Sequence, residues 1–501
     1  MRLDEFNKLV AATPRRRGQT LVVPFVRRVS ADLLTPVSAY LQLREPGKPS
    51  FLLESVEGGE RLARYSFIGK RPFRMVEARG VETAVSDVDA SDNPSRRIMR
   101  EGGFFTVMQQ VLDEYVEVVD PDLPRLRGGA VGYVSYDAVR LLERISMNGH
   151  STDGPPDALW GLYRSIVAFD HVKHQVVVIS NAVVDDDTDL ESSHERAVRN
   201  LEQLQEELFS ESFTRPERVR LEDSIPTANM TRAEFEEAVR DAKHEIFEGN
   251  ALQIVLSQRF DTSFQGDRFN LYRALRQVNP SPYLYFLDFG ELTLIGSSPE
   301  VLVRVEQGRA ELLPIAGTRP RGKDAAEDRR LEEDLLADAK ERAEHAMLVD
   351  LGRNDLGRVC RLDSVKVDRY AFVERYSHVM HIVSSVSGRL GDGRTPMEVL
   401  AACFPAGTVS GAPKVSAMQI IDRLELDRRG VYAGAVGYVD FSGNMDMCIA
   451  IRTMVVQQNR VSIQAGAGIV ADSDPSREYD ETVNKARALH EAIRVAAEEL
   501  I

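Results

Sequence analysis

Cysteine is scarce in this sequence. Only three cysteines occur in 501 residues, Cys360, Cys403 and Cys448. They are too few and too scattered for a disulfide framework or a zinc site. A reducing compartment suits such a chain, so we expect a cytoplasmic protein.

Long apolar runs and an excess of positive charge are also missing. No uncharged apolar run reaches the ~20 residues needed to span a bilayer, and residues 1–5 lack the apolar core of a signal peptide. With 63 Lys and Arg against 78 Asp and Glu, the formal net charge is −15. We therefore expect neither a membrane partner nor a nucleic-acid partner.

What remains is the composition of an ordinary globular protein, with 43% hydrophobic and 28% charged residues. A chain of 501 residues is longer than one hydrophobic core usually serves, so two closely packed subdomains are expected. The acidic cluster at residues 185–189 is interpreted as a solvated helix entry rather than a metal site.

The pattern changes near the middle of the chain. Residues 1–183 read mainly as strands and turns, and a helix with apolar spacings of four, three and four is predicted over residues 190–209. Residues 210–229 contain Pro216 and Pro226 and are the candidate linker. We predict an N-terminal region over residues 1–215 and a second region over residues 226–501.

The second region starts with a helix signal. Thr231 and Glu234 form a capping box, and Gly249 and Asn250 end the predicted helix. A strand is predicted over residues 252–260, in which Gln253 points to the less apolar face. Further strands are predicted over residues 431–441, 448–456 and 461–466. Because helices and strands follow in irregular order, the sequence favours an α+β fold with large antiparallel sheets and flanking helices.

Two Glu-x-x-Glu pairs are candidate metal ligands. Glu341 and Glu344 lie in a helical run over residues 327–351, and Glu478 and Glu481 lie near the C-terminus. Residues three apart share a helix face, and converging carboxylates need a cation such as Mg²⁺ between them. Alternatively, Glu341 could pair with His345, and Glu478 could pair with Arg477 or face solvent.

Three glycine-rich strings provide the context for these pairs. They are residues 314–322 (Pro-Ile-Ala-Gly-Thr-Arg-Pro-Arg-Gly), 404–414 (Phe-Pro-Ala-Gly-Thr-Val-Ser-Gly-Ala-Pro-Lys) and 465–470 (Ala-Gly-Ala-Gly-Ile-Val). Glycines allow backbone amides to approach an anion closely, although each string alone could simply form tight turns.

Together, these strings and pairs resemble the chorismate-utilising enzymes, a family that includes anthranilate, aminodeoxychorismate, isochorismate and salicylate synthases. The resemblance is strong from about residue 231 to the C-terminus and weaker through residues 52–55 and 64–69. It implies a Mg²⁺ cofactor held by Glu344 and Glu481, assisted by Glu341 and Glu478, and chorismate as the substrate.

The resemblance also implies roles for other residues. Glu300 matches the acid that protonates the departing ring hydroxyl, and His381 matches a histidine implicated in pyruvate elimination. The implied substrate contacts are Gly317, Thr318, Tyr432, Arg452, Gly466, Gly468 and Lys485. Without the family context, His381 would be read as structural and Arg452 as part of a buried ion pair.

Two positions favour one reaction. Gln253 stands where isochorismate and salicylate synthases carry a lysine that activates water, and glutamine is no useful general base. Ala316 stands where aminodeoxychorismate synthases often carry a lysine nucleophile. Ammonia is therefore the expected nucleophile, as in anthranilate synthase. Aminodeoxychorismate synthase, an inactive tryptophan-binding regulator and a purely structural protein are the alternatives.

The resemblance implies a protein partner and an inhibitor. No cysteine lies in a nucleophile-elbow setting, so we expect a separate glutamine amidotransferase subunit, component II, to supply ammonia. Residues 52–55 and 279–284 resemble the element through which L-tryptophan inhibits the family's anthranilate synthases. The residues implied are Leu53, Glu54, Ser55, Pro280, Ser281, Pro282 and Tyr283. A buried strand and a proline turn are the alternative interpretation.

Overall fold

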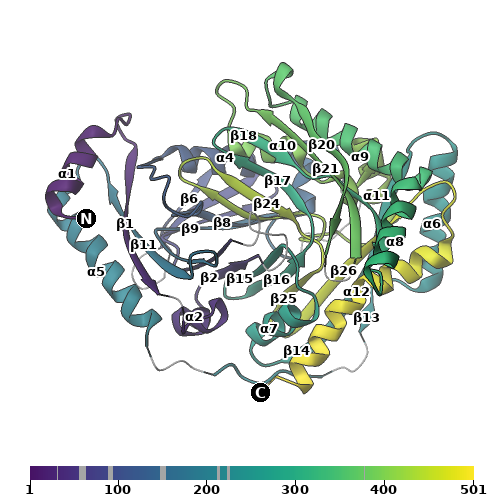
Figure 1. Ribbon diagram of the computed structural model, residues 1–501, viewed down its shortest axis with the longest axis horizontal. Coiled ribbons are helices and arrows are strands. Elements are labelled where there is room, and N and C mark those ends of the chain that lie inside the picture. The colour runs from purple at the N-terminus through teal and green to yellow at the C-terminus, as the bar shows by residue number, and fades with distance from the viewer. Residues whose placement is uncertain are drawn as a thin grey trace.

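Two large sheets form the centre of the computed structural model, which describes residues 1–30, 32–55, 64–88, 94–146, 154–210, 215–222, 226–376 and 379–500 (Figure 1). In these residues every strand pair is antiparallel except β1 with β7. The predicted α+β class with antiparallel sheets is confirmed.

The first sheet has fourteen strands within the described part of the chain. In spatial order they are β12 (Arg220–Leu221), β14 (Gln253–Gln265), β26 (Arg460–Ile469), β25 (Thr453–Gln457), β16 (Leu292–Ser298), β15 (Tyr283–Asp288), β2 (Ser50–Glu54), β3 (Tyr65–Lys70), β10 (Ser165–Asp170), β11 (Gln175–Val184), β1 (Thr20–Ser30) and β7 (Tyr115–Glu117), with β13 (Thr227–Ala228) and β22 (Gly411–Ala412) beside β14.

The second sheet has twelve strands in the same described ranges. They are β19 (Ile315–Pro320), β21 (Val379–Arg389), β18 (Arg309–Leu312), β17 (Val301–Glu306), β24 (Met445–Ile449), β23 (Ala435–Asp440), β8 (Gly129–Val134), β9 (Ala158–Tyr163), β4 (Arg74–Arg79), β5 (Glu82–Val88) and β6 (Pro94–Arg100), with β20 (Lys366–Arg375) beside β21. Both sheets thus contain strands from both predicted regions. The boundary at residues 215–226 stays a prediction.

The sheets pack face to face, and helices cover their outer faces. Buried side chains from β3, β10, β15 and β16 of the first sheet meet those of β8, β9 and β23 of the second sheet. The helices are α1 (Leu3–Ala12), α2 (Pro36–Leu43), α4 (Gly103–Asp113), α5 (Leu190–Leu208), α6 (Arg232–Phe247), α7 (Arg268–Val278), α8 (Ala325–Ala337), α9 (Ala339–Gly357), α10 (Pro396–Cys403), α11 (Lys414–Leu424) and α12 (Pro475–Glu498).

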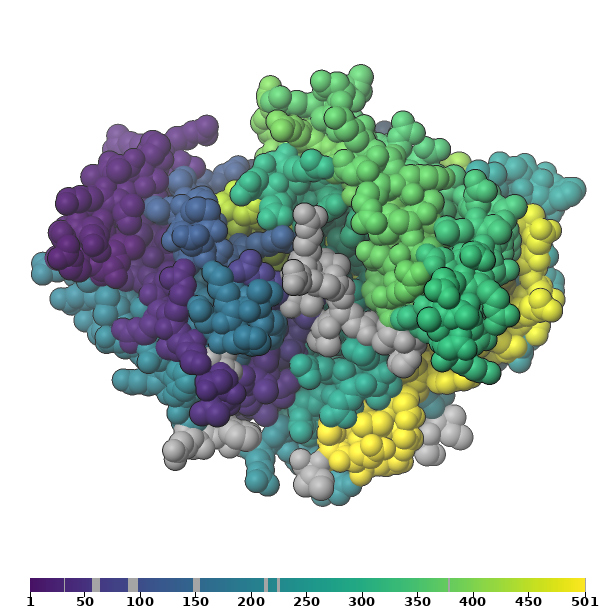
Figure 2. Space-filling view, viewed as in Figure 1, coloured from purple at the N-terminus to yellow at the C-terminus, as the bar shows by residue number. Residues whose placement is uncertain are grey.

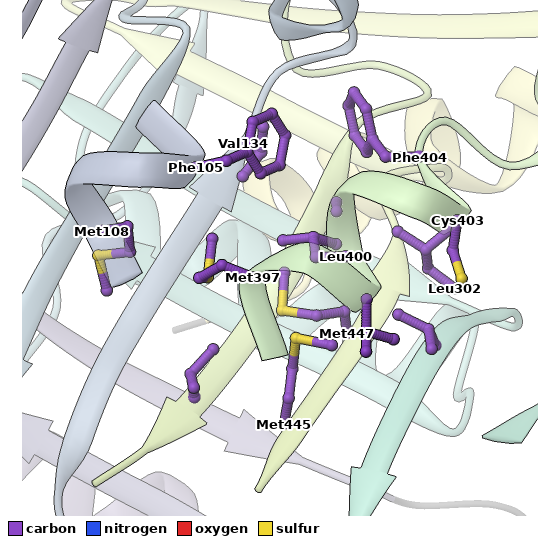
Figure 3. Packing of buried hydrophobic residues seen from close by; sticks show 14 of the residues in the cluster. Phe105, Met108, Val134, Leu302, Met397, Leu400, Cys403, Phe404, Met445 and Met447 are labelled. Atoms are coloured by element: carbon purple, nitrogen blue, oxygen red, sulfur yellow. The ribbon is translucent and has the colours of Figure 1, made fainter. Parts of the chain in front are cut away.

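The outer face of the second sheet shows how these layers join. Met397 and Leu400 of α10 lie beside Met445 and Met447 of β24, while Phe105 of α4 lies beside Val134 of β8 (Figure 3). At the first sheet, α12 packs on α7, α6 and β26. Figure 2 shows the green segment with α8 and α9 beside the yellow C-terminal helix on one face of the molecule.

Several local predictions agree with the structure. Helix α5 covers the predicted range, and the acidic cluster before it is exposed except for Thr188, with Asp189 capping the helix. Thr231 and Glu234 form the predicted capping box of α6. The candidate linker, however, contributes β12 and β13 to the first sheet.

Other boundaries were wrong. The helical run over residues 327–351 is two helices, because Asp338 adopts an extended conformation and caps α9 with its carboxylate. The strand predicted over residues 448–456 is β24 and β25, which belong to different sheets. The strand predicted from residue 431 starts at Ala435, and Leu252 is 66% exposed ahead of β14.

The remaining sequence features concern cysteine and membrane spans. All three cysteines are buried and unpaired. Among the described residues, no helix is both long enough and apolar enough to cross a membrane.

Candidate active site

Six of the predicted site residues line one cavity of about 160 Å³. They are Glu300, Tyr432, Arg452, Gly466, Gly468 and Lys485. These residues come from the loop before β17, the approaches to β23 and β25, strand β26 and helix α12. A wider hollow at Arg452 and Lys485 adds Glu481 and opens toward the surface.

Glu300 is the acidic group of this cavity. Burial raises the pKa of its carboxyl to about 7, although the Thr408 hydroxyl, which donates a 2.8 Å hydrogen bond to Oε1, opposes the shift. The group is therefore protonated on a substantial fraction of molecules at neutral pH. Thr408 belongs to a glycine-rich string of the sequence, but nothing local indicated its contact with Glu300, 108 positions away.

Two cations face the same space. Within the described residues Arg452 has no carboxylate at ion-pair distance, and its Nη1 donates to Asn279 Oδ1 at 3.2 Å. The ion pair considered as an alternative for Arg452 is therefore not found there. Lys485 Nζ lies 2.7 Å from Glu481 Oε1 and donates to the Gly466 carbonyl at 3.0 Å. A ligand carrying carboxylates matches this arrangement.

Two polar side chains lie directly against the glycines of β26. A Cβ at Gly466 would lie 2.6 Å from the Tyr432 hydroxyl oxygen, and a Cβ at Gly468 would lie 2.8 Å from Gln253 Nε2. Any larger residue would displace these polar groups. Gln253 itself is 8% exposed, and its Nε2 lies 3.5 Å from Glu344 Oε1.

His381, Thr318 and Gly317 form a neighbouring group at a β-bulge. Gly317 has a φ of +66° and is the extra residue between the pairs Ala316–Ile382 and Thr318–His381. His381 Nδ1 donates to the Gly317 carbonyl at 3.0 Å, which leaves Nε2 as the free acceptor. Burial chiefly, and nearby Arg452 further, lower the pKa of His381. None of the three lines the cavity of Glu300.

The four predicted metal-binding carboxylates lie on α9 and α12. Burial and then Glu341 raise the pKa of Glu344, while burial and nearby Glu481 raise the pKa of Glu478. The charges of Lys340 and Lys485 lower the pKa of both Glu344 and Glu478, so the two glutamate pairs lie in one neighbourhood. Among the described residues, however, no three His, Cys, Asp or Glu side chains converge closely enough to hold a metal ion.

Glu341 contacts Arg319 rather than His345. Arg319 Nη1 donates to Glu341 Oε1 at 3.3 Å, whereas His345 is buried and its Nε2 lies 2.6 Å from Ser384 Oγ. Ala316, one of the two positions that separate the family's reactions, is 7% exposed and lines none of the cavities described here.

The two segments expected to bind tryptophan are neighbouring strands. β2 pairs with β15, with Glu54 opposite Leu284. Five of the seven predicted residues line a cavity of about 210 Å³, namely Leu53, Glu54, Ser55, Pro282 and Tyr283. Pro280 and Ser281 do not line it, and Ser281 is buried with its hydroxyl donating to the Ser298 carbonyl.

Polar groups in this second cavity differ in their partners. The Glu54 carboxylate accepts hydrogen bonds from Tyr272 and from Arg276 at 2.9 Å, while the buried Ser55 hydroxyl has no hydrogen-bond partner among the described residues. Tyr283 donates to Asp446, which also pairs with Arg304. Arg304 and Asp446 line the cavity but were not predicted, because single charged residues in strands carry no local signal.

Comparison with known proteins identifies the class. A family model described as chorismate binding enzyme matches residues 48–491. The chain therefore belongs to the chorismate-binding enzyme family.

Individual relatives indicate which member of the family the chain resembles. Anthranilate synthase component 1 of Aquifex aeolicus is 46% identical, covering 95% of this chain and 96% of the relative. The same component of Pseudomonas aeruginosa is 43% identical, with 99% of both chains covered. Within the family, the chain thus groups with component 1 of anthranilate synthase.

Solved structures agree with this grouping. The crystal structure of anthranilate synthase component I from Streptococcus pneumoniae matches with a TM-score of 0.73 and 38% identity, covering 93% of this chain and 99% of that chain. The menaquinone-specific isochorismate synthase from Escherichia coli matches with a TM-score of 0.71 at 20% identity, which shows a shared fold alone.

Proposed function

We propose that this chain is the chorismate-converting component of a cytoplasmic anthranilate synthase, which forms anthranilate and pyruvate from chorismate and ammonia at the start of tryptophan biosynthesis. The observation that carries the proposal is the joint placement of Glu300, Arg452 and Lys485 in one cavity. A carboxylic acid with a pKa of about 7 can give a proton at neutral pH, and two cations can hold a dicarboxylate.

The residues in and beside this cavity divide the tasks of the reaction. Arg452 and the Tyr432 hydroxyl hold the enolpyruvyl carboxylate, and the backbone amide of Gly468 adds a third donor. Glu300 Oε gives its proton to the ring hydroxyl, which leaves as water while ammonia bonds to ring carbon 2 and both ring double bonds shift; the ammonium group so formed then loses one proton to solvent. His381 Nε2 then accepts the proton of carbon 2, and the bond between ring carbon 3 and the enolpyruvyl oxygen breaks as the ring becomes aromatic. The released enolpyruvate takes up a proton at its methylene carbon and becomes pyruvate.

The chemistry of the residues on α9 and α12 suits a Mg²⁺ ion, which would draw together carboxylates that do not converge in the structure described. The donors are all carboxylate oxygens, and the pKa values of Glu344 and Glu478 are raised in part by the neighbouring glutamates, a repulsion that a cation would relieve. Glu344 and Glu481 would hold the ion directly, with Glu341 and Glu478 assisting through water. Such an ion supplies a Lewis acid for the ring carboxylate.

Gln253 selects ammonia over water as the nucleophile. Its amide cannot accept a proton at neutral pH, so it cannot activate water. Its amide nitrogen lies beside Gly468 of the cavity wall and close to Glu344. There the amide can orient a nucleophile that needs no deprotonation before it attacks.

The first test uses the purified chain with chorismate, Mg²⁺ and either ammonium or glutamine. We expect anthranilate fluorescence with ammonium and none with glutamine alone, because a glutamine amidotransferase partner must release ammonia. Adding that partner should restore the use of glutamine. Isochorismate or aminodeoxychorismate as the product would contradict the assigned reaction, and glutamine use by the chain alone would contradict the need for a partner.

We further propose that L-tryptophan inhibits this enzyme by binding in the cavity between β2 and β15. Leu53, Pro282 and Tyr283 supply apolar walls, and the Ser55 hydroxyl, which has no partner in the described part of the chain, supplies a polar contact. Glu54 supports the pocket through its ion pair with Arg276 rather than standing free. Tryptophan would favour a state that binds chorismate poorly, so inhibition would look competitive.

Replacing Ser55 by phenylalanine tests this pocket. The phenylalanine ring would occupy part of the roughly 210 Å³ cavity, so Ser55→Phe should stay active but bind tryptophan more weakly. We expect the tryptophan concentration needed for half-inhibition to rise at least about 10-fold, which corresponds to the loss of about one buried contact. The measurement is anthranilate formation against tryptophan concentration, with exposed Ser476→Phe as the matched control. A variant that remains fully inhibited, or a wild type that ignores millimolar tryptophan, would place the inhibitor elsewhere.

A further inference from the structure

The side chain that holds Arg452 in place is a neutral one. Arg452 has a φ of +48° and lies where the chain crosses from β24 in one sheet to β25 in the other. In the described part of the chain its guanidinium makes one hydrogen bond to another side chain, to the neutral amide of Asn279, 173 positions away. An arginine that is half-buried, as Arg452 is, more often has a carboxylate partner.

Asn279 is itself fixed on several sides. It follows the last residue of α7, and its backbone N–H donates to Leu275. Its amide Nδ2 donates to the Ser297 hydroxyl at 3.4 Å, and that hydroxyl donates back to the Asn279 carbonyl. The backbone N–H of Ser297 also donates to the Arg452 carbonyl at 3.1 Å. Ser297 therefore joins the backbone of Arg452 to the residue that holds its side chain.

We propose that Asn279 is a positioning residue for Arg452, which orients the guanidinium through a neutral acceptor and so leaves its full charge for the substrate carboxylate. This inference rests on the proposed function. A carboxylate at position 279 would have nearly the same shape as asparagine and would accept the same hydrogen bond. It would also neutralise Arg452 in a poorly solvated place, where it would compete with the substrate for the same donors.

This role predicts which of two variants of Asn279 binds chorismate more weakly. Asn279→Asp keeps the size and the acceptor, whereas Asn279→Ala removes both. If asparagine served only to support the fold, the alanine variant would be the more damaged of the two. Because we assign it the task of orienting without neutralising, the aspartate variant should bind chorismate more weakly than the alanine variant.

The test measures steady-state anthranilate formation by both variants with ammonium. Asn279→Asp should raise the KM for chorismate about 10- to 100-fold, as expected for a lost charge-assisted contact, with kcat and the KM for ammonium changed much less. Asn279→Ala should raise the KM for chorismate less than Asn279→Asp does. The exposed Asn459→Asp serves as the control for the same chemical change and should behave like wild type.

The outcomes separate the two proposals. A wild-type chain that forms no anthranilate would overturn the proposed function itself. An active wild type whose Asn279→Asp variant keeps its KM for chorismate would overturn only the role of Asn279, as would a larger effect of alanine than of aspartate. If the aspartate variant fails to fold, an alanine variant with a loss in kcat rather than in KM would also contradict this role.

Discussion

Glu300→Gln should reduce kcat for anthranilate formation by about 10²- to 10⁴-fold, the usual contribution of a positioned general acid. Glutamine keeps the shape of the side chain and can still meet the Thr408 hydroxyl, but it has no proton to give. Burial holds the pKa of Glu300 at about 7, well above its ordinary value. The acid form is present below that pH and is lost as the pH rises through it.

The pH profile provides the second measurement of the same prediction. At a fixed concentration of free ammonia, kcat/KM for chorismate in the wild type should fall about tenfold per pH unit above pH 7. The residual rate of Glu300→Gln should lack this fall. Thr408→Val is the companion variant: the Thr408 hydrogen bond lowers the Glu300 pKa, so its loss should move the fall to higher pH. A wild-type profile with no fall between pH 6 and 9 would exclude Glu300 as the acid.

Glu344→Gln and Glu481→Gln should each reduce turnover on the order of 10³-fold, because each removes a charge that the proposed Mg²⁺ ion would require. The remaining activity should respond only weakly to added Mg²⁺. The measurement is anthranilate formation over a titration of Mg²⁺ after treatment with a chelator. Direct binding of the ion, followed by calorimetry, should weaken in parallel.

The matched control for these two variants is Asp350→Asn. Asp350 lies on the same helix as Glu344, but its side chain is 72% exposed and pairs only with Arg353 in the part of the chain described. It loses the same charge without touching the proposed metal site and should retain activity and Mg²⁺ response. Near-normal turnover with an unchanged Mg²⁺ response in both glutamate variants would remove the metal assignment.

Much of the fold could be predicted because its signals are local. The capping box of Thr231 and Glu234 and the apolar spacing of α5 are complete within a few residues, and both helices start where expected. The break at Asp338 was missed because good helix formers stand on both sides of it. The crossing between sheets near Arg452 was missed because apolar strand residues flank it.

The candidate site was predictable only in part, for the same physical reason. Motifs identified which residues to expect, and six of them line one cavity. The contacts that adjust those residues join distant positions, such as Thr408 with Glu300 and Asn279 with Arg452. A hydrogen bond between distant segments depends on the packing of whole sheets, and no local pattern of residues encodes it.

Each sheet contains strands from both the early and the late part of the chain, so some strands are synthesised long before their partners. β8 at residues 129–134 pairs with β9 on one side and with β23 at residues 435–440 on the other. At about 5–20 residues per second, the ribosome needs on the order of 15–60 s to synthesise the ~300 residues between β8 and β23. The edge of β8 that pairs with β23 stays unpaired during that time. Unpaired edges are sites of aggregation, so the nascent chain depends on protection for most of its synthesis.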